Sequence, residues 1–455
     1  EISRRHFLKM VGAGAAAALA ACAGKKTTDS ADTTYANQLE PPVGQMTYRT
    51  CPTTGDRVSL LGYGMMRLPM VEGTEEFDQD MINRQVDYAM EHGVNYYDTS
   101  PVYCRGLSER CTGIALSRHP RDSYFVATKL SNFDPRFHSA ENAKKMYHDS
   151  MKELQVDYID YYLLHAIGGS MEEFNRRYVE NGIMDFLLEE RLAGRIRNLG
   201  FSFHGRKEVF DAVLAMHDKY RWDFVQIELN WLDWNYADEI NDRNVDASYL
   251  YAELMKMGIP AVIMEPLLGG RLSKVPQYVA SQLKQRTPQK SIASWAFRYA
   301  GTPEGVLTVL SGMTYMEHLK DNLLSYCPLQ PLTDEEQHLL DTTIAHQMME
   351  EETIPCNACQ YCMPCPYGIN IPGIFKFYND NVTAGTYVQS KEQEGYARAR
   401  RKYLLAYDEA IPTVRQADHC IACRRCEPEC PQNIRIPDQL RRIDKYIESL
   451  KRETL

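Results

Sequence analysis

The sequence predicts an α/β protein, a (β/α)8 barrel of parallel strands followed by a small all-α domain. Two observations predict this order. Eight short runs rich in β-branched and aromatic residues alternate with longer amphipathic stretches between residues 58 and 325. Eight of the thirteen cysteines gather in two clusters after residue 355. The length of 455 residues suits two or three domains better than one.

The N-terminal segment, residues 1–22, has the pattern of an export signal. Arg4 and Arg5 are adjacent, and an apolar run rich in Ala and Gly then ends at Cys22. The segment resembles a twin-arginine signal, a type that carries folded proteins, and its last four residues resemble a lipobox. These resemblances imply an exported protein at the outer face of the cytoplasmic membrane or in the periplasm, with membrane contact through a lipid on Cys22. A plain signal peptide with a chance cysteine is the alternative.

Residues 23–45 are polar with two prolines near their end, which predicts a flexible tether. The apolar run over residues 11–23 is too short to span a bilayer. The net charge is −10, and the sequence contains no basic tract that would follow a phosphate backbone. We therefore expect no nucleic-acid partner.

The barrel is expected over residues 46–328. Its predicted strands are residues 59–64, 94–98, 124–129, 158–165, 196–202, 224–230, 260–266 and 306–312. Helical patterns lie between them, such as residues 78–93, which end at Gly93 where a helix C′ residue is expected. Eight βα units in this length are typical of a TIM barrel. A doubly wound sheet is the alternative, although no GxGxxG follows the first strand.

Polar residues end three consecutive predicted strands, at Asp98, Lys129 and His165, and Tyr103 follows the first of them by five positions. In a barrel the carboxyl ends of the strands meet at one rim, where active sites lie. Each residue alone has an ordinary structural explanation, as a cap, a solvated strand end or a core histidine. Four at one rim predict proton transfer to a carbonyl oxygen, with Lys129 lowering the pKa of Tyr103.

Residues 46–325 resemble the aldo-keto reductases. The stretch YYDTSPVYCRGLSERCTGIAL beginning at Tyr97, then FVATKL and YYLLHAI, carry the catalytic Asp, Tyr, Lys and His of that family in order. The resemblance implies that carbonyls and alcohols are interconverted with NADP(H) or NAD(H). It implies that Tyr103 is the general acid, that Lys129 and Asp98 tune it, and that His165 positions the small-molecule substrate.

The same resemblance implies a set of cofactor-binding residues along the rim. They are Gly64, Met65, Ser202, Gln226, Met264, Pro266, Leu267, Gly269, Gly270, Ser311, Gly312, Met313, His318, Asp321 and Asn322. Gln226 and Ser202 match the partners of the nicotinamide carboxamide, and residues 264–272 match the loop that covers the pyrophosphate. The family's Asn after Ser202 is Phe203 here, and the basic residues that clamp a 2′-phosphate align with Gly312 and His318. NADPH and NADH therefore both stay open.

A linking helix is expected over residues 329–352, because Thr333 and Glu336 have the spacing of a capping box ahead of a helical pattern. Residues 353–455 then form the second domain. Two similar stretches, CPYGINIPGIF from Cys365 and CPQNIRIPDQL from Cys430, each follow a cysteine cluster and lead into a predicted helix.

The two cysteine runs have iron–sulfur spacing. The second run is C-x₂-C-x₂-C-x₃-C-P, and the first differs by one residue in its last gap. In ferredoxins with two clusters the fourth cysteine of each run binds the other cluster. We therefore expect two [4Fe–4S] clusters, one held by Cys356, Cys359, Cys362 and Cys430, and the other by Cys420, Cys423, Cys426 and Cys365. A pair of zinc sites is the alternative, but zinc ligands usually come as CxxC pairs with a longer spacer.

The long helical insertion between Cys365 and Cys420 gives this domain a resemblance to the α-helical ferredoxins. Iron–sulfur clusters are inserted in the cytoplasm, so the cysteines and the twin-arginine signal explain each other. The leading hypothesis is an exported oxidoreductase that retains a bound nicotinamide and passes electrons through the clusters to a membrane partner. The alternatives are a reductase with purely structural clusters, and a nicotinamide-binding redox sensor or regulatory subunit.

Overall fold

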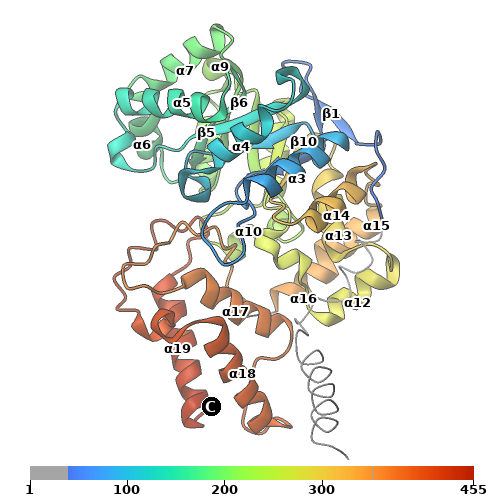
Figure 1. The fold of residues 1–455 in the computed structure, drawn as a ribbon, viewed down its shortest axis with the longest axis vertical. Coiled ribbons are helices and arrows are strands. Elements are labelled where there is room, and N and C mark those ends of the chain that lie inside the picture. The colour runs from blue at the N-terminus through green and yellow to red at the C-terminus, as the bar shows by residue number, and fades with distance from the viewer. Residues whose placement is uncertain (1–38, 351) are drawn as a thin grey trace, which may run out of the picture.

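The computed structural model describes residues 39–350 and 352–455, which form a barrel and a helical C-terminal domain (Figure 1). The predicted signal, the lipobox at Cys22 and the tether up to residue 38 lie outside these residues. Within the described chain, no helix has both the length and the apolar character required to cross a bilayer. The first described residues lie against the barrel, where Glu40 accepts a hydrogen bond from the Tyr88 hydroxyl at 2.7 Å.

Eight parallel strands close into the predicted barrel, with β10 beside β3. The strands are β3 (Leu61–Gly64), β4 (Tyr96–Asp98), β5 (Phe125–Leu130), β6 (Ile159–Ile167), β7 (Ile196–Phe203), β8 (Phe224–Glu228), β9 (Ala261–Met264) and β10 (Val306–Ser311). The eight predicted strands are thus confirmed. The first one begins two residues late, because Ser59 belongs to a preceding hairpin and its amide donates to Asn95 at 2.8 Å.

Helices surround the barrel and cover its strands on the outside (Figure 1). They are α3 (Gln79–Glu91), α4 (Ser108–Leu116), α5 (Ala140–Leu154), α6 (Met171–Phe174), α7 (Ile183–Leu192), α8 (Lys207–Leu214), α9 (His217–Tyr220), α10 (Asp233–Ile240), α11 (Ala247–Lys256), α12 (Gln277–Arg286), α13 (Ile292–Gly301) and α14 (Met316–Tyr326). The ends of α3 follow the prediction: Asp78 caps its first turn, and Gly93 adopts a φ of 90° just beyond its last.

A broken helix leads from the barrel to the C-terminal domain. Its parts are α15 (Asp334–His338), a π-helical turn (Leu339–Ile344) and α16 (Ala345–Met349). The predicted capping box is formed, since Thr333 and Glu336 each accept a hydrogen bond from the other's backbone amide. The connection is firmly attached to the barrel, because Glu336 pairs with Arg298 at 2.6 Å.

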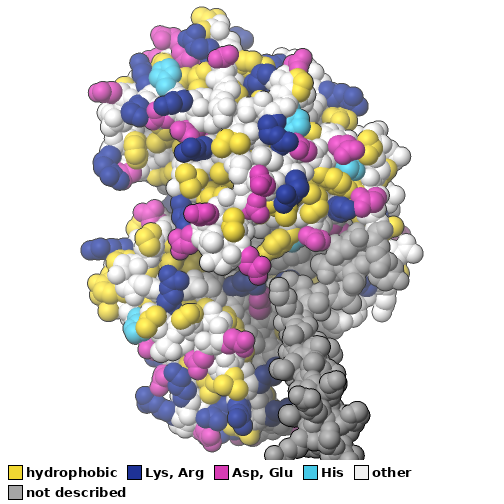
Figure 2. Space-filling model, viewed as in Figure 1, with side chains coloured by type: hydrophobic (Ala, Val, Ile, Leu, Met, Phe, Trp, Pro, Cys, Tyr) yellow, Lys and Arg dark blue, Asp and Glu magenta, His cyan; other side chains and the backbone are white. Residues whose placement is uncertain are grey.

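The C-terminal domain has its own apolar core, built between α17 (Ile371–Thr383), α18 (Tyr396–Ala410) and α19 (Ile436–Arg452). Each of the two similar stretches leads into a helix, as predicted. The helices α17 and α19 start at the Ile-Pro of these stretches, because proline is well tolerated in the first turn of a helix. Figure 2 shows charges of both signs mixed over the visible face of the barrel and of this domain.

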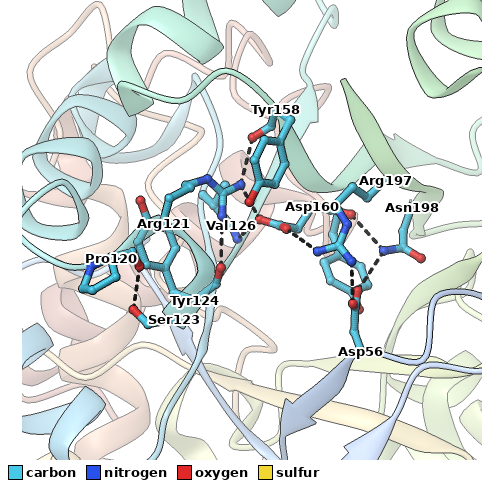
Figure 3. Close-up of polar contacts among 11 residues, drawn as sticks. Asp56, Pro120, Arg121, Ser123, Tyr124, Val126, Tyr158, Asp160, Arg197 and Asn198 are labelled. Atoms are coloured by element: carbon cyan, nitrogen blue, oxygen red, sulfur yellow. Dashed lines mark hydrogen bonds and ion pairs between the residues drawn. The ribbon is translucent and has the colours of Figure 1, made fainter. Parts of the chain in front are cut away.

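The end of the barrel at which the strands begin is closed by the hairpin of β1 (Tyr48–Thr50) and β2 (Arg57–Ser59). A buried ion network joins this hairpin to the strands (Figure 3). Asp160 pairs with Arg121 at 2.6 Å and with Arg197 at 3.1 Å, and Arg197 also pairs with Asp56 at 2.7 Å. These charges are satisfied within the barrel itself.

Candidate active site and cysteine clusters

The four predicted catalytic residues meet at the opposite end, where the strands finish. Asp98 ends β4, Lys129 lies in β5, His165 lies in β6, and Tyr103 lies in the short helical turn after β4. All four are buried. The Lys129 ammonium donates to both carboxylate oxygens of Asp98, at 2.6 and 2.7 Å, and to the carbonyl of Thr99 at 2.8 Å.

Tyr103 lies over this ion pair. Its ring centre is 4.9 Å from the Lys129 ammonium, and its ring meets that of His165 edge to face at 5.8 Å. The next two residues, Cys104 and Arg105, adopt left-handed backbone angles, which turn the chain sharply after the tyrosine. The turn is held where the Cys104 thiol donates to the carbonyl of Met66 at 3.3 Å.

Burial controls the ionisation of this group. It raises the pKa of Asp98 and lowers that of Lys129, while the contact between the two opposes both shifts and keeps the pair ionic. The pKa of Tyr103 lies well above its usual value, because of burial first and then the neighbouring Tyr361, Asp98 and Glu265. Burial therefore outweighs the lowering that the sequence predicts from the Lys129 charge, although that ammonium lies 4.9 Å from the centre of the ring.

His165 is held as a neutral imidazole. Burial lowers its pKa well below 6.5, and the charges of Lys129, His204 and Arg177 add to this effect. Its Nδ1 lies 2.6 Å from the Ser131 hydroxyl, and its backbone carbonyl accepts from Arg177 at 2.8 Å. In the tautomer in which Ser131 donates to Nδ1, the neutral ring carries its proton on Nε2 and can donate it to a substrate oxygen.

The residues predicted to hold the nicotinamide carboxamide lie in the same mouth. The buried Gln226 side chain places its Nε2 3.3 Å from the Met264 sulfur and leaves its Oε1 without a partner. A buried amide oxygen without a donor is costly, and the amide group of a nicotinamide would supply that donor. The hydroxyl of Ser202 accepts from the amide of Ala166 at 2.7 Å. This part of the site therefore fits the predicted cofactor.

Of the other predicted cofactor residues, some contact one another, whereas others contact residues outside the predicted set. Gly64 lies against the backbone of Ser311, where a β-carbon would approach within 3.2 Å, and Asn322 donates to the Ser311 hydroxyl at 2.9 Å. Asp321, in contrast, accepts from Ser291 at 2.6 Å. The loop of residues 265–273 follows β9, where Gly269 and Gly270 both have positive φ. Arg67, which the sequence did not reveal, packs its side chain over Gly312.

The first predicted set of cluster ligands surrounds one hollow. Cys356, Cys359, Cys362 and Cys430 all line a space of about 320 Å³ that is partly open to solvent. Cys430 comes from the second run, as the exchange of fourth cysteines predicts. Burial raises the pKa of Cys356 to about 11 and that of Cys359 to about 12. Four thiols around one space fit the ligand set of a four-iron cluster.

In the second predicted set, Cys426 has Cys420 and Cys423 as electrostatic neighbours, and Cys423 is exposed. Cys365 is half-buried against the apolar core of the domain. The cysteines of the described chain are free of disulfides. Among the same residues, no three His, Cys, Asp or Glu side chains are close enough to hold a single metal ion.

The first cysteine run also reaches into the mouth of the barrel. Tyr361, between Cys359 and Cys362, lies close enough to Tyr103 for each hydroxyl to shift the pKa of the other. Asn357 donates to the Glu265 carboxylate at 3.2 Å. No sequence pattern pointed to these two residues, because each looks like a spacer between cysteines.

Comparisons with known families agree with this arrangement. The model of the aldo/keto reductase family matches residues 60–345. The chain belongs to the aldo/keto reductase family. A 4Fe–4S dicluster domain matches residues 355–435, and a signal of the twin-arginine translocation pathway matches residues 1–21. The predicted order of signal, reductase barrel and iron–sulfur domain is confirmed.

Individual relatives cover the barrel. An Arabidopsis thaliana protein named L-galactose dehydrogenase is 26% identical over 324 residues, which are 68% of this chain and 96% of the relative. The Bacillus halodurans aldo-keto reductase AKR11C1 has a TM-score of 0.52 and 24% identity, and the match covers 65% of this chain and 95% of that one. A Klebsiella pneumoniae aldo-keto reductase in complex with NADPH has a TM-score of 0.52 and 20% identity, covering 66% and 96%. The two structures show a shared fold.

Proposed function

We propose that this exported aldo/keto reductase interconverts a small carbonyl compound and an alcohol with NADP(H) or NAD(H), and exchanges electrons with a membrane partner through two [4Fe–4S] clusters. The observation that carries the proposal is the meeting of Asp98, Tyr103, Lys129 and His165 at the mouth of the barrel, directly beneath the first cysteine run. The lipid on Cys22 would keep the protein at the outer face of the membrane.

Each residue of the tetrad has a distinct role. Tyr103 stays protonated at neutral pH, because its pKa is raised, and so has a proton to give to the substrate oxygen. Lys129, fixed by Asp98, places a positive charge beside the ring of Tyr103 and stabilises the phenolate as it forms. His165 orients the carbonyl through Nε2. Gln226 and Ser202 would hold the carboxamide of a nicotinamide, which would supply or accept the hydride when bound.

The clusters would lie in sequence between the barrel and the surface. The first set, Cys356, Cys359, Cys362 and Cys430, belongs to the segment that contacts the mouth. The second set is Cys420, Cys423, Cys426 and Cys365, and Cys423 is exposed. Cys362 and Cys426 are electrostatic neighbours across the two sets. Clusters held by these cysteines would take one electron each from the pair that an alcohol loses as hydride to NAD(P)⁺, and would pass them toward the exposed side of the domain.

An anaerobic titration tests the proposal. Protein with intact clusters receives NADH and NADPH in separate samples, and the clusters are followed by EPR. Reduction by either nicotinamide is the expected result, and it would make barrel and clusters one electron path. If neither reduces the clusters while the barrel still binds the cofactor, the clusters are structural. Tight nicotinamide binding with no turnover of any carbonyl or alcohol would favour a redox sensor instead.

A further inference from the structure

The loop over residues 265–273, which follows β9, contains nearly all of residues 264–272, the segment expected to cover the pyrophosphate of the cofactor. It folds back on itself, since the amide of Gly269 donates to the Glu265 carboxylate at 2.6 Å. Glu265 and Leu268 have positive φ, which side chains other than glycine rarely adopt without support from their surroundings. A loop with such a backbone requires outside contacts to keep its shape.

The C-terminal domain supplies those contacts. The other carboxylate oxygen of Glu265 accepts from the side chain of Asn357 at 3.2 Å. At Gly269 the two chains are so close that an added β-carbon would lie 2.3 Å from the Cα of Asn357. Further along, Arg271 donates to the hydroxyl of Thr353 at 2.6 Å. The loop is therefore attached to the iron–sulfur domain near both of its ends.

A third element ties this contact to the far side of the mouth. Arg67 donates to the backbone carbonyl of Asn357, while its side chain packs over Gly312. Asn357 is 5% exposed, so its amide group has exchanged water for these protein contacts. Opening the loop would break the hydrogen bonds from Asn357 and Arg271 and leave the half-buried Glu265 short of a donor, which costs more than breaking the same bonds in water.

We propose that Asn357 and Thr353 position the loop over residues 265–273 so that a nicotinamide dinucleotide stays in the barrel as a resident cofactor. The inference rests on the proposed function, in which the barrel binds nicotinamide. An exported enzyme benefits from this arrangement, because it leaves the compartment in which its cofactor is made. The iron–sulfur domain thus acts on the cofactor through the loop, in addition to any electron transfer.

The test is the rate at which the cofactor leaves. Anaerobically purified, cluster-loaded protein is saturated with radiolabelled NADP⁺ or NAD⁺, then mixed with an excess of the same unlabelled nucleotide, and the label that stays on the protein is followed over time. We expect Asn357→Ala to speed dissociation by tenfold or more, and Thr353→Val by a smaller factor of at least three. Iron content and visible absorption show whether each variant still holds its clusters.

The matched control is Asp242→Ala. It removes another hydrogen bond between the domains, the one from Asn433 to Asp242 at 2.8 Å, but at an exposed place away from the loop. We expect its dissociation rate to equal that of the unaltered protein. If Asn357→Ala disturbs the first cluster, Thr353→Val decides, because Thr353 lies outside the cysteine run.

Two results would overturn the inference, and they differ. If the unaltered protein binds nicotinamide but both variants release it within twofold of its rate, the loop contacts do not retain the cofactor and the proposed function stands. If the unaltered protein binds neither NADPH nor NADH, the proposed function fails together with the inference.

Discussion

The two ends of the barrel carry similar charges in different arrangements. Where the strands begin, Asp160 is paired with two arginines and accepts from the amide of Val126 at 2.9 Å (Figure 3). Where the strands finish, Asp98 is paired with a single lysine, and the tyrosine above them has a raised pKa. At the first end both carboxylates find their charged partners within the barrel, although the Nε atom of Arg121 has no partner. The second borrows Tyr361 and Asn357 from another domain.

The difference separates stability from chemistry. The arginines of the first network reach solvent, since their side chains are 24% and 35% exposed, and their charges are therefore partly hydrated. The two arginines also equal in number the two aspartates with which they pair. At the mouth, Lys129 is fully buried, and Gln226 keeps a polar atom without a partner. Groups whose partners are missing or supplied from elsewhere are typical of functional sites, because a ligand completes them.

The largest expected effect is on turnover at the mouth. Tyr103→Phe removes the proton donor and should reduce kcat by roughly 10²–10⁴-fold, the usual contribution of a general acid. The matched change at the other end, Tyr161→Phe, removes a hydroxyl that donates to Asp56 at 3.2 Å and should leave kcat unchanged. Steady-state kinetics with a panel of small aldehydes measure both. A Tyr103→Phe protein with full activity would contradict the assigned role.

The next effect is on stability at the other end. Asp160→Asn removes the charge that holds Arg121 and Arg197, and should lower the free energy of unfolding by roughly 2–3 kcal/mol, somewhat below a fully buried pair because both arginines reach solvent. The melting temperature of the barrel, followed by circular dichroism, should fall by several degrees. Asp149→Asn, at an exposed pair with Lys145, is the control and should not shift it. If Asp160→Asn lost activity but kept its melting temperature, this end of the barrel would serve the chemistry and not the stability of the protein.

A smaller effect depends on pH. His165 has a pKa well below 6.5 in the folded protein, chiefly because of burial, while the unfolded chain titrates near 6.5. The unfolded state therefore binds a proton that the folded state does not, and stability falls as the pH drops below 6.5, by up to about 1.4 kcal/mol per pH unit. Melting temperatures from pH 8 to 5.5 should decline more steeply for the unaltered protein than for His165→Asn. Equal slopes would contradict this.

The smallest effect concerns the borrowed tyrosine. Tyr361→Phe removes a hydroxyl that occupies the hydrogen-bonding site of Tyr103 where a substrate oxygen must bind. We expect KM for a small aldehyde to fall by about fivefold, the worth of roughly 1 kcal/mol for one hydrogen bond. The exposed Tyr367 offers a control, as Tyr367→Phe should leave KM unchanged. An unchanged KM in Tyr361→Phe would place the phenol outside the substrate's path.

Much of the fold could be predicted from local patterns. The eight strands, the capping box at Thr333 and the Ile-Pro starts of α17 and α19 all follow from short-range periodicity and cap chemistry. The meeting of the four tetrad residues at one rim could also be predicted, because the strands of a closed parallel barrel all point the same way. The placement of Cys430 beside the cysteines of the first run could be predicted from the spacing of the two runs and from the exchange of fourth cysteines in ferredoxins.

The contacts of Arg67 with Asn357 and of Asn357 with Glu265 could not be predicted, since they join residues 290 and 92 positions apart. The direction of the Tyr103 pKa shift was also out of reach. It depends on burial and on Tyr361, and neither is a property of the segment around Tyr103.

By itself, the sequence determined the export signal, the barrel, the tetrad and the two cysteine runs, because these depend on residue type and spacing along the chain. Tertiary structure decided how the two domains share one mouth: which spacer residue lies beside Tyr103, and which one contacts the loop after β9. The physical reason is that hydrogen bonding and burial between distant segments depend on where each segment lies in space, and no local pattern encodes that position.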